Sequence, residues 1–169
     1  MQDENQAERN QRKINRLQAY DYNTSGAYFV TICTQDRKKI LSNIVGDDAH
    51  IVPKPYGCIA EKYIRNVPEI EKYVIMPDHI HMIIRLGNGS MWASTPTMEQ
   101  VDYHNRPQHN RISSIVRSIK VLVTKEIGVS IFQRSYYDHV IRNQRDFDEI
   151  WEYIEHNPVK WVEKYKKMK

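Results

Sequence analysis

The stretch that decides the fold is Tyr73-Val74-Ile75-Met76-Pro77-Asp78-His79-Ile80-His81-Met82-Ile83-Ile84-Arg85-Leu86. Apolar residues fill it and Pro77-Asp78 interrupts it, which predicts a hairpin of strands over 71–76 and 79–86. Because successive side chains of a strand point to opposite faces, His79 and His81 share one face with Ile83 and Arg85, and the other face carries Ile80, Met82, Ile84 and Leu86. Two imidazoles on one face can bind one metal ion, although each can also find an ordinary hydrogen-bond partner.

The segments outside this hairpin alternate between strand and helix patterns. We expect a strand over 28–34, an irregular final strand over 131–142, a short edge strand over 51–53, and helices over 56–67, 112–127 and 145–156. The order strand, helix, hairpin, helix, strand predicts an α+β fold, with a ferredoxin-like or RRM-like antiparallel sheet and helices on one face.

The last predicted helix carries a second group of polar residues. Its apolar residues repeat with helical spacing, and Tyr153 and Asn157 lie one turn apart on the flank of that apolar stripe. We expect the helix to end near Pro158, which would bias Asn157 away from helical geometry. A phenol at the border between core and solvent can reach a phosphate as a nucleophile, or it can simply cover the edge of the core.

Four blocks of the chain together resemble one family. They are Gly26-Ala27-Tyr28-Phe29-Val30-Thr31-Ile32-Cys33-Thr34, Val74-Ile75-Met76-Pro77-Asp78-His79-Ile80-His81, Phe132-Gln133-Arg134-Ser135-Tyr136-Tyr137-Asp138-His139-Val140-Ile141-Arg142-Asn143, and Glu152-Tyr153-Ile154-Glu155-His156-Asn157-Pro158-Val159-Lys160. In this order they resemble the single-tyrosine HUH transposases of the small single-stranded insertion-sequence class, in the branch of REP-associated tyrosine transposases. The resemblance covers most of residues 20–162 and implies the HUH endonuclease fold.

The resemblance also implies roles for individual residues. His79 and His81 would be metal ligands, Tyr153 the nucleophile, and Asn157 the third ligand at a position where the transposases proper often have glutamine. The shorter Asn157 side chain leaves open direct ligation, ligation through water, or a role in capping the helix alone. The implied cofactor is a divalent metal, Mg²⁺ or Mn²⁺.

The implied activity is cleavage and rejoining of single-stranded or hairpin DNA, including REP-like DNA, through a 5′-phosphotyrosine intermediate. Two other functions stay open on the residues alone. One is a domesticated DNA-binding protein or regulator that does not transpose, and the other is a metal-dependent nuclease that does not use Tyr153. The residues do not choose between a monomer and a homodimer.

Basic residues suggest where DNA would lie. The net charge is +4 at pH 7, a modest excess that favours an anionic partner. The candidate DNA contacts are Arg12, Lys13, Arg16, Arg117, Lys120, Arg134, His139 and Arg142. The pair Arg117 and Lys120 could equally form a solvated helix face, and the last three could instead fix the final strand by hydrogen bonds.

Composition divides the chain into a polar, basic arm over 1–24, one domain over 25–162 and a basic tail over 163–169. Residues 87–110 are rich in Gly, Pro and polar side chains and are expected to form a long loop. Cys33 and Cys58 form no metal or disulfide pattern. We also find no signal peptide and no apolar run long enough for a membrane span, so we expect a cytoplasmic, nucleoid-associated protein without a membrane partner.

Overall fold

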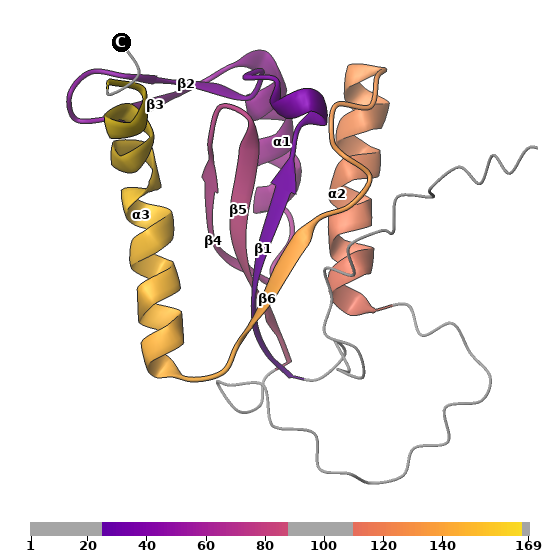
Figure 1. The fold of residues 1–169 in the computed structure, drawn as a ribbon. Helices are drawn as coiled ribbons and strands as arrows, with labels where there is room; N and C mark the ends of the chain where they lie inside the picture. Colours follow the sequence, from indigo (N-terminus) through magenta and orange to yellow (C-terminus); the bar gives the residue numbers. More distant parts are fainter. Residues whose placement is uncertain (1–24, 88–109, 167–169) are drawn as a thin grey trace, which may run out of the picture.

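The structure is a computed structural model that describes residues 25–87 and 110–166 (Figure 1). The arm over 1–24, nearly all of the predicted loop over 87–110, and residues 167–169 lie outside the described residues. The elements are β1 (Gly26–Cys33), η1 (Gln35–Arg37), β2 (Ser42–Val45), β3 (His50–Pro53), α1 (Pro55–Arg65), β4 (Ile70–Ile75), β5 (His79–Leu86), α2 (Arg111–Ile127), β6 (Tyr137–Ile141) and α3 (Gln144–Lys166). No helix in the described ranges has both the length and the hydropathy that a membrane span requires.

The main sheet has four antiparallel strands in the order β4-β5-β1-β6. The predicted hairpin is therefore confirmed as β4 and β5, and β5 is an inner strand with partners on both sides. In the pairing of β1 with β5, Thr31 lies opposite His81 and Cys33 lies opposite His79. The predicted edge strand is present as β3, but it pairs with β2, a strand that was not predicted, in a separate two-stranded ribbon.

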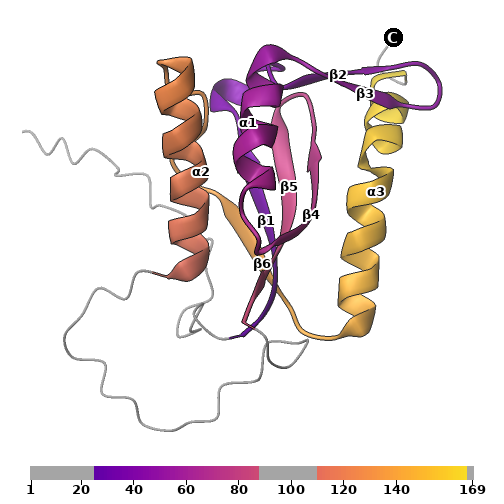
Figure 2. The ribbon, with the colours of Figure 1, turned by 180° about the vertical axis from the view of Figure 1, so that it is seen from behind.

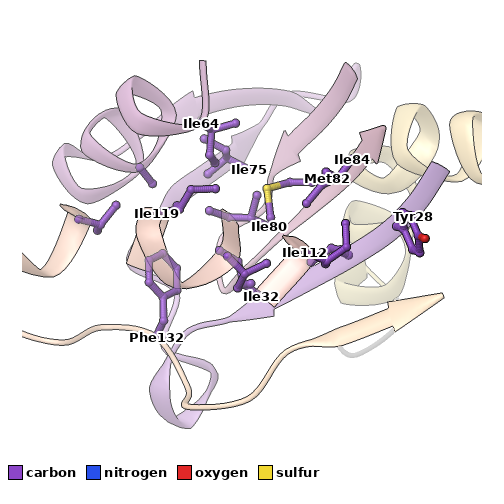
Figure 3. Close-up of a cluster of buried hydrophobic side chains, with 14 of the residues drawn as sticks. Tyr28, Ile32, Ile64, Ile75, Ile80, Met82, Ile84, Ile112, Ile119 and Phe132 are labelled. Atoms are coloured by element: carbon purple, nitrogen blue, oxygen red, sulfur yellow. The ribbon is translucent and has the colours of Figure 1, made fainter. Parts of the chain in front are cut away.

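Each face of the main sheet has its own hydrophobic core. Alternate residues of β1 and β5, among them Ile32, Ile80 and Met82, pack against α1 and α2 (Figure 3). On the opposite face, Val74, Ile83 and their neighbours pack against Ile154 of α3 and form the second core. Figures 1 and 2 both show the sheet between α2 and α3.

This arrangement confirms the predicted α+β antiparallel sheet and corrects one detail of it. Helices were expected on one face, and α1 and α2 do share a face, but α3 covers the other. The reason is that the histidine face of the sheet is also apolar beyond the histidines, since Ala27, Ile83 and Ile141 are buried there and need cover.

The helix α3 does not end at Pro158, as the sequence had led us to expect, but continues to Lys166. A proline inside a helix removes one backbone hydrogen bond. Here the loss is offset by packing, because Pro158 is buried and Trp161, less than one turn later, packs against the second core. Ile44 and Ile51 of the β2–β3 ribbon pack against the same core. The helix thus runs four residues into the predicted tail, and Asn157 lies within it rather than at its end.

The final strand is shorter than predicted. Residues 131–136 precede β6 in an irregular path, and only Phe132 forms a bridge, to Thr34. Gln133 fixes this segment to the end of β1, because its backbone N–H donates to the Cys33 carbonyl at 2.8 Å and its side chain donates to the Thr34 carbonyl at 3.0 Å. The segment therefore lies beside the histidine end of the sheet.

The first turn of α1 gives a stability prediction. A Cβ atom on Gly57 would lie 2.0 Å from the backbone oxygen of Leu41, so Gly57→Ala must displace the helix or the chain before β2. We expect a loss of about 1–3 kcal/mol in the free energy of unfolding, measured by urea titration. Cys58→Ala, at the exposed neighbouring position, is the control. Equal unfolding midpoints for the two variants would contradict this packing.

Candidate active site

The two histidines of β5 meet at their outer ring nitrogens. His79 and His81 are both buried, and their Nε2 atoms are 3.0 Å apart. Metal–nitrogen bonds of about 2.1 Å that meet at a right angle would place two nitrogens about 3.0 Å apart. The pair therefore fits two adjacent ligands of one ion, as well as a hydrogen bond between neutral imidazoles.

Hydrogen bonds at the Nδ1 atoms fix the direction of each histidine ring. His79 Nδ1 bonds the carboxylate of Asp78, which can only accept, so the proton of neutral His79 is on Nδ1 and the lone pair of Nε2 points into the site. Thr31 Oγ1 is 2.8 Å from His81 Nδ1. Carboxylate and hydroxyl partners of this kind orient metal-binding histidines.

The electrostatics of the site favour neutral histidines. Burial, together with the nearby charges of His79 and Arg37, lowers the pKa of His81 to about 3. Burial also lowers the pKa of His79, although the Asp78 carboxylate opposes this shift. Both rings are therefore unprotonated at neutral pH, which is the form that binds metal.

Sequence reasoning missed Arg37, which supports the Asp78 carboxylate from the side opposite His79. Its Nε lies 3.4 Å from Asp78 Oδ2, and its Nη1 donates to the Cys33 sulfur at 2.9 Å. Asp36 and Arg37 both have left-handed backbone geometry, with φ of 53° and 54°, which non-glycine residues seldom adopt. The turn is fixed by buried Thr34, whose hydroxyl contacts the carbonyls of Lys38 and Asp78 at 2.9 and 3.0 Å.

The helix α3 brings Tyr153 to the histidine pair. The Tyr153 hydroxyl is 3.4 Å from His81 Nε2, and the two ring centroids are 5.3 Å apart. Phe29 meets the Tyr153 ring edge-on at 6.0 Å. The side chain is thus held from two sides but remains 39% exposed, so a substrate can reach the hydroxyl.

Asn157 lies one turn further along α3. Its side chain is buried in the wall of a cavity that His79, His81 and Tyr153 also line. Because it is inside the helix, the capping role that its place before Pro158 suggested does not apply. The described part of the chain contains no group of three His, Cys, Asp or Glu side chains that could hold a metal ion. An ion on the two histidines would therefore take its other ligands from Asn157, water or substrate.

These groups share an open cavity of about 690 Å³. All four residues that the sequence singled out for chemistry line it: His79, His81, Tyr153 and Asn157. Sequence reasoning missed the rest of the lining, which is Thr31, Cys33, Arg37, Gln133, Tyr137, Lys160, Trp161 and Lys164. Lys160, Trp161 and Lys164 could have been found by continuing the helical periodicity past Pro158.

Three of the predicted DNA contacts lie elsewhere, around a second cavity. Arg117, Lys120 and Arg134 line it together with Tyr136. The Lys120 ammonium donates to the carbonyls of Gln133 at 2.8 Å and Ser135 at 2.9 Å, and burial lowers its pKa to about 8. Lys120 therefore holds the 133–135 segment in place, and its predicted contact with DNA stays a prediction, as do those of Arg117 and Arg134.

The other predicted contacts are near α3 or outside the described residues. His139 Nε2 bonds Asp146 at 3.0 Å, and the backbone N–H of Arg142 donates to the same carboxylate at 3.1 Å. These bonds fix the end of β6 to the first turn of α3, the alternative role that the sequence left open. Arg12, Lys13 and Arg16 lie outside the described residues.

Comparisons with known proteins give relatives over most of the chain. No family model matches. An uncharacterized protein of Haemophilus influenzae is 31% identical over 165 residues, 89% of each chain, so the two belong to one family. Another protein of that organism, provisionally named a REP-associated tyrosine transposase, is 28% identical over 141 residues, 83% of this chain and 74% of that protein.

A solved structure gives the same relationship in three dimensions. It is described as a REP-associated tyrosine transposase bound to a REP hairpin, and it matches with a TM-score of 0.55 and 26% identity over 86% of this chain and 73% of that one. The chain is therefore similar in sequence and in fold to REP-associated tyrosine transposases.

The hydrogen bond between Asp78 and His79 gives a testable prediction. Asp78→Ala should weaken Mn²⁺ binding by about 10- to 100-fold, because His79 loses the partner that orients its Nε2 lone pair. Asp78→Asn should have a smaller effect, since the amide oxygen can still accept from Nδ1 while the negative charge is lost. Isothermal titration calorimetry with Mn²⁺ measures both. Wild-type affinity in Asp78→Ala would show that this bond does not support a metal site.

Proposed function

We propose that this chain is a REP-associated tyrosine transposase that cleaves and rejoins single-stranded or hairpin DNA through a 5′-phosphotyrosine on Tyr153. The observation that carries the proposal is the 3.4 Å approach of the Tyr153 hydroxyl to His81 Nε2, beside a second inward-facing histidine and in an open cavity. The similarity to a transposase described as bound to a REP hairpin supports the choice of DNA as substrate.

The residues present fit a divalent metal, Mg²⁺ or Mn²⁺. His79 and His81 would hold it through Nε2, because each Nδ1 already has a partner, and Asn157 would contribute its amide oxygen. When bound, such an ion polarises a phosphate and stabilises charge on the leaving oxygen. Mg²⁺ prefers oxygen ligands, so the two imidazoles favour Mn²⁺. The greater abundance of Mg²⁺ in cells favours Mg²⁺ instead.

The chain's own residues account for the covalent step. The Tyr153 oxygen attacks phosphorus, the bond from phosphorus to the 3′ oxygen breaks, and the upstream fragment leaves with a free 3′-hydroxyl. The downstream fragment remains joined to Tyr153 through its 5′ phosphate. The phenol proton must leave as the bond forms, and the exposed hydroxyl can pass it to water while the departing 3′ oxygen takes one up. Attack by a 3′-hydroxyl on the phosphotyrosine reverses the step and restores the tyrosine.

The phosphate would meet positive charge at the cavity. Arg37, Lys160 and Lys164 are the cationic side chains among the described residues that line it, the histidines being neutral, and no described Asp or Glu side chain lines it. Such a site attracts a polyanion and lets its backbone approach the nucleophile. The second basic cavity, with Arg117 and Arg134, would take a more distant part of the same DNA.

The nucleophile is tested by Tyr153→Phe, which removes one oxygen and little surface. We expect the variant to form no covalent adduct with a labelled hairpin oligonucleotide in the presence of Mn²⁺, on a denaturing gel, while its affinity for the hairpin stays within a few-fold of wild type. Tyr137→Phe is the matched control, because Tyr137 lines the same cavity and is also exposed.

Three outcomes of this experiment would contradict the proposed role of Tyr153. Adduct formation by Tyr153→Phe and its loss in Tyr137→Phe would make Tyr137 the nucleophile. Cleavage by wild type without an adduct would indicate a metal-dependent nuclease. Hairpin binding without any cleavage would indicate a DNA-binding regulator on the same fold.

The third ligand is tested by Asn157→Ala. If the amide oxygen binds the ion, the variant should need a much higher Mn²⁺ concentration for half-maximal cleavage, with a smaller change in rate at saturating Mn²⁺. The side chain is buried in the cavity wall, so the unfolding midpoint is measured in parallel. An unchanged Mn²⁺ titration would mean that water and DNA complete a two-histidine site.

A further inference from the structure

We propose that Lys160 and Lys164, on the part of α3 beyond Pro158, form a binding subsite for the unpaired nucleotides that flank the scissile phosphate. This inference rests on the proposed function, because it takes Tyr153 to mark the scissile phosphate. It adds to that function the path by which a DNA strand reaches the nucleophile.

The first observation is the alignment of these lysines with Tyr153. At about 100° per residue, positions 153, 157, 160 and 164 fall within one narrow stripe of a helix. All four of these residues line the cavity. Lys160 and Lys164 are about 6 Å apart along the axis at 1.5 Å per residue. The stripe therefore places one cation per turn beyond the nucleophile and Asn157.

The second observation is the charge around this stripe. Lys160 and Lys164 are exposed, and Lys160 Nζ lies 5.4 Å from the centre of the Tyr153 ring. Glu155 lies off the stripe and pairs with Lys72 at 3.5 Å. Since no described carboxylate lines the cavity, the two ammonium groups add to the field of Arg37 at the place where a phosphate backbone would enter.

The third observation is the rigidity of the helix extension. Trp161 packs into the second core, with its ring centroid 6.0 Å from that of His79 and Lys39 Nζ 5.6 Å from its ring. The β2–β3 ribbon covers this end of α3 (Figure 1). The lysines are therefore presented from a fixed helix at a set distance from the metal-binding pair, as a backbone-tracking site requires.

The occupant that fits is a single strand rather than a duplex. The lysines form one row, in line with the nucleophile, so a strand whose phosphate is at Tyr153 passes Lys160 and Lys164 with its next phosphates. Contacts of this type bind the backbone without reading its sequence, and they release about 0.7 counterions per phosphate of a single strand.

The test measures equilibrium binding without chemistry, in the Tyr153→Phe background. Fluorescence anisotropy with a labelled hairpin bearing an unpaired flank gives the slope of log affinity against log salt. Lys160→Ala with Lys164→Ala should flatten the slope by about 1.4, for two phosphate contacts. In the protein with both lysines, we expect the affinity for the hairpin to rise as the unpaired flank is lengthened. The two alanine substitutions together should abolish this rise. Lys160→Arg with Lys164→Arg should keep both properties.

The control removes two positive charges from the other face of the sheet, by Lys62→Ala with Arg65→Ala on the exposed side of α1. An unchanged slope in the Lys160 and Lys164 variant, an equal loss in the control, or no binding of the flank by the parent protein would overturn the subsite. These readings do not depend on cleavage. Absence of a Tyr153 adduct in the active protein would refute the proposed nucleophile while the measured slopes still decide the subsite.

Discussion

The position of β5 between β4 and β1 is the constraint on which the rest of the structure depends. Ile80, Met82 and Ile84 are fully buried under α1 and α2, and both neighbouring strands fix the register of β5. A slip by one residue would turn these side chains to the other face and put the histidines into the core. The hydrophobic core therefore sets the direction of His79 and His81, and through it the geometry of the site.

Three polar partners convert that direction into a site with defined chemistry. Asp78 contacts Nδ1 of His79, and Thr31 contacts Nδ1 of His81. Arg37 in turn contacts the Asp78 carboxylate. Burial favours the neutral form of both imidazoles, and each can bind an ion through the Nε2 lone pair when its ring proton is on Nδ1. Arg37 lies in η1, the short turn that comes shortly after β1, so a segment next to the strand that fixes the register supplies the outermost support of the site.

The helix α3 adds the nucleophile and more of the cavity than its sequence suggested. Its apolar stripe packs on the histidine face, which leaves Tyr153 and Asn157 at the border of the cavity. Beyond Pro158 the helix is held by Trp161 against the second core and the β2–β3 ribbon. The proline costs one backbone hydrogen bond, and the burial of apolar surface around it offsets that cost.

The sequence by itself determined the α+β class, the β4–β5 hairpin, the helical segments and the four residues at the centre of the cavity, because alternation and helical spacing are local properties of the chain. Tertiary structure alone decided that α3 covers the opposite face from α1 and α2, that it passes through Pro158, and that Arg37 supports Asp78. It also turned the Lys120 ammonium toward backbone carbonyls. These features depend on which apolar surfaces meet and which carbonyls lack donors after the chain has packed, and segments distant in the sequence supply them.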